Sequence, residues 1–337
     1  MHAIQHSRRI SVMMAALLVS GMVVGFGNTG RIGASSDDAN KPLTIAVVPK
    51  AVTIDFYQQV RKGAVCAASR LKNVTVNWDG PTTIDIAGQI SILQNMITNG
   101  VNAIDFAALD SHALAPVAKQ ALAHHVAVVT FDSGISPQGH VPLFATNNVA
   151  NAAKVADLMA AALGPRGGKV AFIHFNPGSQ TDNERTLGFK QGLKRHPELK
   201  LVSEQNGQAD LNTALGVVAD ILSAHPDIQA IFGAEERAAV GAGRAVQRAG
   251  KTGQVKVFGW DAAPDELDAL KSGLLSAIIV QNPFRMGFDS VNAAVKTVRT
   301  GAKVQGEDTG SIVVTKANLN QRAVQAIVNP SCATSAR

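Results

Sequence analysis

Short apolar runs, many of them β-branched, alternate with segments of helical periodicity along most of the chain. Where apolar residues recur every three or four positions, as at Phe56, Val60 and Ala64, the pattern predicts an amphipathic helix. Such alternation is typical of a parallel sheet with helices on both of its faces. The predicted strands of the first half are Leu43–Val48, Val74–Trp78, Ala103–Ala107 and Val126–Phe131.

The same alternation starts again after residue 147. Asn147 or Asn148 is placed to cap the next helix, and Thr181 with Glu184 fits a capping box at the start of a later one. A length of 337 residues suits two domains of ordinary size. We therefore predict an α/β fold of two Rossmann-like lobes, each a doubly wound parallel sheet. The predicted strands of the second half are Lys169–Phe175, Leu199–Ser203, Ala230–Gly233, Val255–Gly259 and Leu275–Val280.

Polar and aromatic residues follow the ends of many predicted strands. Ligands of open parallel sheets bind beyond the carboxyl ends of the strands, so these residues are candidates for a binding site. Carboxylates and amides hydrogen-bond hydroxyl groups while rings cover an apolar C–H face, which indicates a small neutral polyhydroxy ligand. Each residue taken singly is equally explained as a turn, helix-cap or core residue, but their agreement favours a site. The candidates are Lys50, Phe56, Tyr57, Asp132, Asp182, Asn183, Glu235, Asp261 and Gln281.

The first 34 residues have the layout of a secretory signal peptide. Arg8 and Arg9 precede the apolar stretch 10–26, and small residues at Gly33 and Ala34 follow it. We expect cleavage after Ala34, although an apolar stretch of this length also permits an uncleaved membrane anchor. Cleavage removes three arginines and no acidic residue, so the net charge of +6 becomes +3. No basic cluster remains, and we predict no nucleic-acid partner.

The chain has two cysteines, Cys66 and Cys332. An even number of cysteines in an oxidising compartment permits a disulfide. Cys66 lies about 120° from the apolar stripe of its predicted helix, so it flanks that stripe where a C-terminal tail is able to reach it. A disulfide and two independent thiols both stay open, because the geometry of the pair decides between them.

No recognised catalytic motif accompanies the carboxylates. They would also suit acid–base catalysis, but the chain has no nucleophile elbow, no His-Glu-x-x-His and no phosphate loop. Gly241 and Gly243 match part of a dinucleotide fingerprint, but they lie in a helical pattern without the third glycine. His124 and His125 are adjacent and point to different faces, which makes them a poor metal-binding pair. We predict a binding protein with no enzymatic activity, cofactor or metal.

Four fragments, taken in order, resemble the type I periplasmic sugar-binding proteins of the ribose-binding-protein class. The resemblance covers about residues 43–317. The Asp-Gly-Pro-Thr-Thr stretch that starts at Asp79, together with Lys50, is similar to the branch that binds rhamnose and the furanosyl autoinducer. The fragments are Trp-Asp-Gly-Pro-Thr-Thr-Ile-Asp-Ile-Ala-Gly-Gln (78–89), Val-Val-Thr-Phe-Asp-Ser (128–133), Val-Phe-Gly-Trp-Asp (257–261) and Val-Gln-Asn-Pro-Phe-Arg-Met-Gly (280–287).

The resemblance implies two lobes that are joined by a hinge of three strands and close around a sugar. The crossovers between the lobes would lie near Asn147, Gln281 and Gly310. The implied division is a signal peptide at 1–34, an N-terminal lobe of 41–147 plus 282–310, a C-terminal lobe of 148–281 plus 311–325, and a C-terminal tail of 326–337.

Several candidates take a role by this resemblance. Phe56 and Tyr57 match the pair of rings that stacks on the sugar. Asp132 and Asp261 match the carboxylates that hold its hydroxyl groups. Gln281 matches a glutamine on the hinge side.

Other positions match other parts of the family or depart from it. Asp182 and Asn183 match polar contacts at a helix start, and Lys50 matches the lysine of the autoinducer branch. Ser133 and Glu235 stand where ribose receptors have Arg and Asn. These departures argue against ribose itself and leave another pentose, a deoxyhexose, a tetrose or a sugar alcohol open.

The function that the resemblance implies is that of the periplasmic substrate-binding protein of an ABC-type carbohydrate importer. Such a protein is a monomer that reaches the membrane only through the permease subunits to which it delivers its ligand. The alternative is a periplasmic sugar sensor that presents its ligand to a chemoreceptor or a sensor kinase, because either partner can read the same closed form. A sugar-dependent repressor shares the fold, but it carries a helix-turn-helix where this chain has the predicted export signal.

Overall fold

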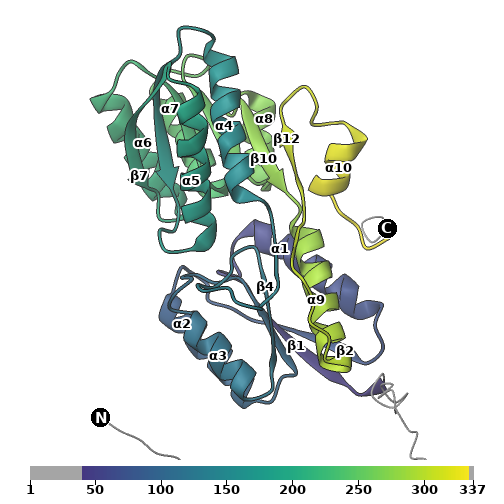
Figure 1. Cartoon of the computed structure of the whole chain (residues 1–337). Helices are drawn as coiled ribbons and strands as arrows, with labels where there is room; N and C mark the ends of the chain where they lie inside the picture. The colour runs from purple at the N-terminus through teal and green to yellow at the C-terminus, as the bar shows by residue number, and fades with distance from the viewer. Residues whose placement is uncertain (1–39, 334–337) are drawn as a thin grey trace, which may run out of the picture. The chain divides into compact units, whose positions relative to one another are not determined.

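The computed structural model describes residues 40–333, and these residues form two six-stranded sheets (Figure 1). The predicted signal peptide, residues 1–34, lies outside the described residues. In the first sheet the strand order is β11-β5-β4-β3-β1-β2, and every neighbouring pair is parallel. Its strands are β1 (Leu43–Val48), β2 (Val74–Trp78), β3 (Ala103–Phe106), β4 (Ala127–Phe131), β5 (Leu143–Ala145) and β11 (Glu307–Asp308).

In the second sheet the strand order is β12-β10-β9-β8-β6-β7. Only the β10–β12 pair among these described strands is antiparallel. The strands are β6 (Gly168–His174), β7 (Leu199–Asn206), β8 (Ile228–Gly233), β9 (Lys256–Trp260), β10 (Ala277–Gln281) and β12 (Ser311–Val314). The predicted class, two α/β lobes with doubly wound and mostly parallel sheets, is confirmed.

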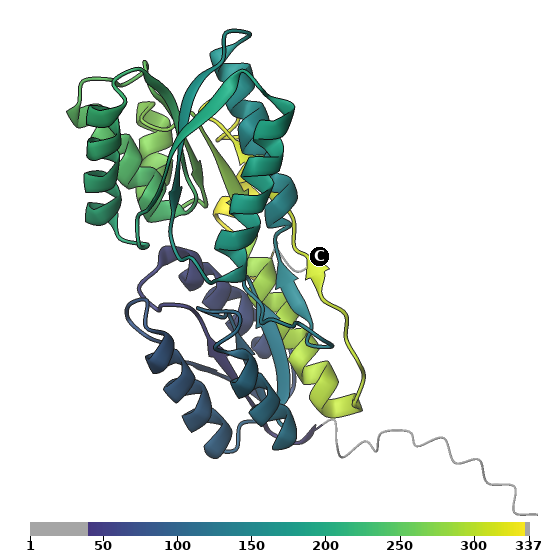
Figure 2. The same ribbon diagram turned by 60° about the vertical axis from the view of Figure 1, so that its left-hand side comes forward.

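Helices cover both faces of each sheet (Figure 2). Successive residues of a strand point to opposite faces, so in β1 Ile45 and Val47 join one apolar cluster and Ala46 and Val48 the other. In the first lobe the two layers are α1 (Asp55–Ser69) with α9 (Pro283–Thr300), and α2 (Ile86–Thr98) with α3 (Ala115–Ala123).

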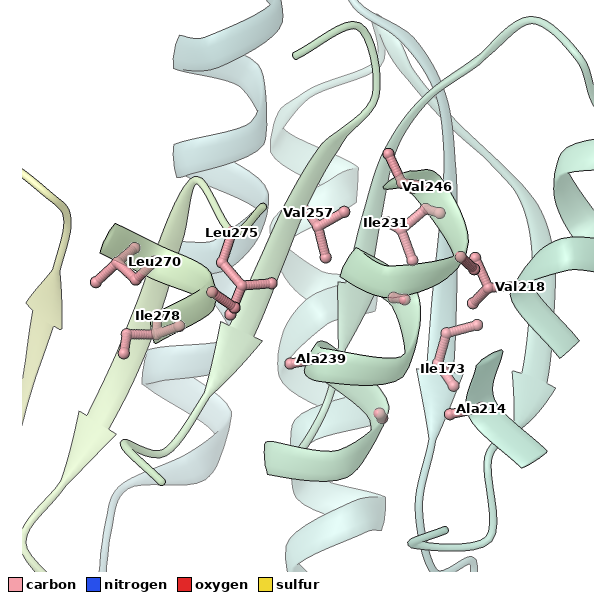
Figure 3. Close-up of a cluster of buried hydrophobic side chains, with 14 of the residues drawn as sticks. Ile173, Ala214, Val218, Ile231, Ala239, Val246, Val257, Leu270, Leu275 and Ile278 are labelled. Carbon is pink, nitrogen blue, oxygen red and sulfur yellow. The ribbon is translucent and has the colours of Figure 1, made fainter. Parts of the chain in front are cut away.

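The second lobe has the same layered construction. Figure 3 shows Ala239 and Val246 of α7 packed over Ile231 of β8 and Val257 of β9. One layer consists of α4 (Asn148–Leu163) and α5 (Gln180–Arg195), and the other of α6 (Leu211–Ala224), α7 (Glu236–Arg248), α8 (Pro264–Ser272) and α10 (Arg322–Val328). Among residues 40–333 no helix is long and apolar enough to cross a membrane.

Within the described residues the chain passes between the two sheets three times. The passages lie between β5 and α4, between β10 and α9, and between β11 and β12. Three short strands, β5, β11 and β12, were not among the predicted strands, because two to four residues give too little periodicity to detect.

The predicted capping box at Thr181 is wrong. Helix α5 begins at Gln180, and its N-cap is Ser179, whose hydroxyl accepts a hydrogen bond from the amide of Asp182. Thr181 therefore lies inside the first helical turn. Asn147, one of the two predicted alternatives, is the N-cap of α4, since its side chain accepts from the amide of Ala150.

The predicted start of the C-terminal tail at residue 326 also needs correction. Helix α10 continues to Val328, and both Val324 and Val328 are buried in the apolar core of the second lobe. An apolar face that packs on a core belongs to that core, so the second lobe extends at least to Val328. Beyond it, Cys332 forms a disulfide with Cys66, with Cα atoms 5.5 Å apart.

Helices α1 and α9 approach each other closely because glycines lie at their contact. A Cβ atom on Gly63 would stand 1.9 Å from the carbonyl oxygen of Phe284, and one on Gly287 would stand 2.1 Å from the carbonyl oxygen of Val60. Any side chain at either position would push the helices apart.

We predict that Gly63→Ala lowers the free energy of unfolding by about 1–3 kcal/mol, because the backbone of α9 must move to admit the methyl group. The control is Gly216→Ala in α6, where a Cβ meets no atom within 4 Å. There alanine should stabilise the helix by about 0.5–1 kcal/mol. Denaturant unfolding of both variants measures the difference. Equal stability of Gly63→Ala and the parent protein would contradict this packing.

Candidate functional site

A cavity lies where the carboxyl ends of the two sheets face each other, and residues of both lobes line it. The volume of this cavity is about 40 Å³, several times the roughly 10–15 Å³ that a single buried water needs. The lining residues are Lys50, Ile54, Phe56, Tyr57, Ile84, Asp132, Phe175, Asn176, Thr181, Arg185, Ala209, Glu235, Asp261 and Gln281.

In the first lobe, Asp132 is the centre of a buried polar network. It follows β4 directly, and its Oδ2 accepts a hydrogen bond from the hydroxyl of Tyr57 at 2.9 Å. The same oxygen lies 3.2 Å from Nζ of Lys50. Lys50 also donates to the hydroxyl of Thr181 in the second lobe at 2.7 Å, so this network crosses the cavity.

In the second lobe, Asp261 follows β9 and takes the corresponding place. Its Oδ1 accepts a hydrogen bond from Nε2 of Gln281 at 2.7 Å. The Oε1 atom of Gln281 is buried and has no hydrogen-bond partner in the described residues. It is thus an acceptor in need of a donor, at the wall of the cavity.

Arg185 brings a fixed positive charge to the same wall. Its guanidinium carbon lies 4.2 Å from the centre of the Trp260 ring and 5.1 Å from that of Phe175, which are cation–π distances. Its Nε donates to the side chain of Asn148 and its Nη1 to the carbonyl of Ala234. These contacts hold the guanidinium group in place. Its positive charge favours the ionised form of Asp261.

Both aspartates have left-handed backbone conformations, with φ of 56° at Asp132 and 93° at Asp261. Non-glycine residues adopt positive φ rarely and at a cost, and such residues gather at functional sites. Each conformation occurs in the residue directly after a strand, where it turns a carboxylate towards the cavity.

Burial raises the pKa of three carboxyl groups, of which Glu235 and Asp261 line the second-lobe wall and Glu236 lies next to Glu235 in sequence. It brings the pKa of Glu235 to about 7, although the amides of Arg237 and Ala238 donate to this side chain and oppose the shift. Burial also raises the pKa of Asp261 to about 6, against the opposing charge of Arg185 and the hydrogen bond from Gln281. The pKa of Glu236 rises well above its usual value for the same reason, with the charge of Asp261 adding to it.

Hydrogen bonds between the lobes surround the cavity. The N-cap residue of α1 makes no side-chain hydrogen bond to the first turn of the helix. The amide of Phe56 in that turn donates instead to Oε2 of Glu236 in the second lobe, at 3.4 Å. Arg237 donates to the carbonyl of Thr53. At the opposite edge Asn176 donates to the carbonyl of Leu109. The structure is therefore that of closed lobes.

Seven of the nine predicted site residues line this one cavity, and two do not. Asp182 is turned into its own lobe, where it accepts from the amide of Phe175 at 3.1 Å and lies 2.9 Å from Nδ1 of His174. Asn183 is exposed on the outer side of α5. The reason is that the N-cap of α5 is Ser179 and not Thr181, so positions 181 and 185 face the cavity in place of 182 and 183.

Seven lining residues were not among the predicted candidates. Three of them are aliphatic, and the four polar or aromatic ones are Phe175, Asn176, Thr181 and Arg185. Phe175 directly follows β6, but the predicted strand included it, so the strand-end rule did not indicate it. Asn176 directly follows the predicted strand, and the same rule was sufficient to indicate it. Arg185 lies one turn after Thr181 within a helix, and no strand end indicates it. Among residues 40–333 no group of three His, Cys, Asp or Glu is placed to hold a metal ion.

The periplasmic binding protein domain family matches residues 45–303 of the chain. The D-allose-binding periplasmic protein of Escherichia coli is 30% identical over 76% of this chain and 85% of its own length. The ribose import binding protein of Salmonella typhimurium is 31% identical over 78% of this chain and 87% of its own length. The resemblance to the ribose-binding class is thereby confirmed.

A solved structure adds to this likeness. An ABC transporter solute-binding protein from Agrobacterium vitis, with bound D-fucose, is 33% identical to this chain. The match covers 85% of this chain and 99% of that one, with a TM-score of 0.81.

The raised pKa of Glu235 predicts a pH dependence of stability. The folded protein holds this proton more tightly than the unfolded chain, where the pKa is 4.5, so the contribution is complete below pH 4.5 and is lost as the pH rises through about 7. We expect the melting temperature of Glu235→Gln to fall less than that of the parent protein between pH 5 and 7.5.

The control is Asp210→Asn at the exposed N-cap of α6. Hydrogen bonds from Thr213 lower the pKa of Asp210, so its contribution is present at neutral pH and is lost only in acid. This variant should follow the slope of the parent protein between pH 5 and 7.5. Parallel curves for Glu235→Gln and the parent protein would contradict the buried state of this carboxyl group.

Proposed function

This chain belongs to the periplasmic binding protein family, and from this premise we propose that it is an exported solute-binding protein for a small neutral sugar or sugar alcohol. The ligand would bind in the cavity between the lobes. The single observation that carries the proposal is the pair Asp132 and Asp261, which reach one buried cavity from separate sheets.

The chemistry of the cavity supports a donor-rich, uncharged ligand. The carboxylates of Asp132 and Asp261, the carboxyl group of Glu235 and the Oε1 atom of Gln281 offer acceptors for hydroxyl groups. Lys50 and Arg185 balance the two aspartates in charge, so an ionic ligand is not needed for neutrality. Phe56, Tyr57 and Phe175 offer ring surfaces for the C–H face of a sugar.

The relatives point to the same ligand class. Allose, ribose and fucose, which appear in the descriptions of three similar proteins, are all uncharged monosaccharides. They differ in carbon number and in hydroxyl pattern. We therefore propose the class, a monosaccharide or sugar alcohol of similar size, and leave the individual ligand to a direct screen.

Binding would proceed by closure of the lobes at the three crossovers. A ligand that contacts both walls has a higher affinity for the closed form than for the open form, so it shifts the population towards closure. The closed protein, a monomer in the periplasm, would then deliver the ligand to the permease subunits of an ABC-type importer without altering it chemically.

A thermal-shift screen tests this function directly. A ligand that binds only the native state raises the melting temperature by mass action. We expect at least one of a panel of pentoses, hexoses, deoxyhexoses, inositols and linear sugar alcohols to raise it, and amino acids and dicarboxylates to leave it unchanged. A shift with the second group only would reject the proposed ligand class.

Substitution of the two aspartates tests the site. Asp132→Asn or Asp261→Asn should weaken the best ligand of the screen by about 10- to 150-fold in Kd, because each loses a charged hydrogen bond worth roughly 1.5–3 kcal/mol. The matched control is Asn183→Ala, an exposed position on α5, which should keep the parent affinity. Isothermal titration calorimetry measures all three, with circular dichroism as the check on folding. Parent affinity in both aspartate variants would discard the site.

A further inference from the structure

The disulfide between Cys66 and Cys332 joins the two lobes. Cys66 belongs to α1 in the first lobe, and Cys332 follows α10 in the second. The bond links positions 266 residues apart in the sequence. It is a covalent connection between the lobes in addition to the three crossovers of the described chain. We call residues 329–333 the C-terminal strap.

The first-lobe end of the strap is rigidly held. Cys66 is buried, and its neighbours on α1, Val60, Ala64 and Ala67, are fully buried in the first-lobe core. The side chain of Arg70, the C-cap residue of the same helix, donates to the carbonyl of Cys332, which fixes the strap from a second direction. The first lobe thus holds the strap through helix α1.

The second-lobe end is held by the packing of α10. Val324 and Val328 lie in the same apolar cluster as Val314 of β12 and Leu270 of α8. Figure 1 shows α10 beside β12, with the chain continuing from it towards the C-terminus. The strap is therefore anchored in one core at each end.

The strap is short. Cys332 follows Val328 by four residues, and four residues span at most about 14 Å when fully extended. Pro330 within the strap has a fixed φ angle, which restricts the backbone of the strap further. The distance from the last anchored turn of α10 to Cys66 therefore has a firm upper limit.

A second cavity, adjacent to the proposed ligand site, lies beside the end of α10, where the strap begins. It is lined by Gln59 and Lys62 of α1, by Pro264 at the start of α8, and by Ile327 and Val328 of α10. It shares Phe56, Asp261 and Gln281 with the proposed ligand cavity. A hinge motion that separates the lobes must change the width of this space, because α1 of the first lobe and α10 of the second line opposite parts of it. The strap joins the same two helices covalently.

We propose that the C-terminal strap, fixed by the Cys66–Cys332 bond, limits how far the two lobes separate. The inference rests on the lobe motion of the proposed function, and it is independent of which ligand binds. With a limited range of opening, fewer open arrangements compete with the closed form. The fraction of binding-competent protein is then higher, and the apparent affinity rises with it.

Small-angle X-ray scattering of three proteins tests the proposal. The first is the parent protein and the second is the Cys66→Ser/Cys332→Ser variant. The third keeps the disulfide but carries six additional Gly and Ser residues between Asn329 and Pro330, which add about 20 Å of reach. We expect a larger radius of gyration for both variants than for the parent protein, each measured without ligand.

The variant with the lengthened strap distinguishes the effect of strap length from the effect of the disulfide itself. If only the serine variant expands, the effect comes from loosened packing of α10, and the proposal fails. Equal radii for all three ligand-free proteins would also overturn it. These comparisons need no ligand, so a failed sugar screen leaves them interpretable. With a ligand from the screen, all three should reach the same closed radius, and the two variants should bind it more weakly than the parent protein.

Discussion

Burial of charged side chains at the junction of two sheets is the constraint on which the rest of this structure depends. Asp132, Asp261 and Arg185 are each less than a tenth exposed, and a buried charge is costly unless a partner compensates it. Lys50 provides that partner for Asp132, and through Thr181 it also ties the first lobe to the second. The closed arrangement buries these groups because each lobe covers the strand ends of the other.

The sheet topology explains why the charged groups meet. In a parallel sheet all carboxyl ends lie at one edge, so the residues after β1 and β4 gather in one lobe and those after β6, β8 and β9 in the other. Positive φ at Asp132 and Asp261 then turns the carboxylates into the shared space. The three crossovers keep the two edges opposite each other, and the C-terminal strap adds a covalent connection with a defined reach.

Much of this site could be predicted from the sequence, because the end of an apolar run marks the end of a strand. Asp132 and Asp261 follow strands of five residues with clear boundaries, and both line the cavity. Asp182 does not line the cavity because the N-cap of its helix is Ser179, two positions before the predicted Thr181, and this shift turns a different face to the cavity. Arg185 was out of reach, since its role depends on Trp260 and Phe175, which only the tertiary fold brings beside it. The pairing of Cys66 with Cys332 likewise required the path of α10, which no local pattern specifies.

The central claim is that both lobes hold one ligand through the residues that end their strands. A crystal structure of the protein with its best sugar tests this most directly. The account predicts one sugar in the cavity, with hydroxyl groups within hydrogen-bond distance of Asp132 from the first lobe and of Asp261 from the second, and a donor on Oε1 of Gln281. A sugar bound by one lobe alone, or at a surface away from these two carboxylates, would contradict it.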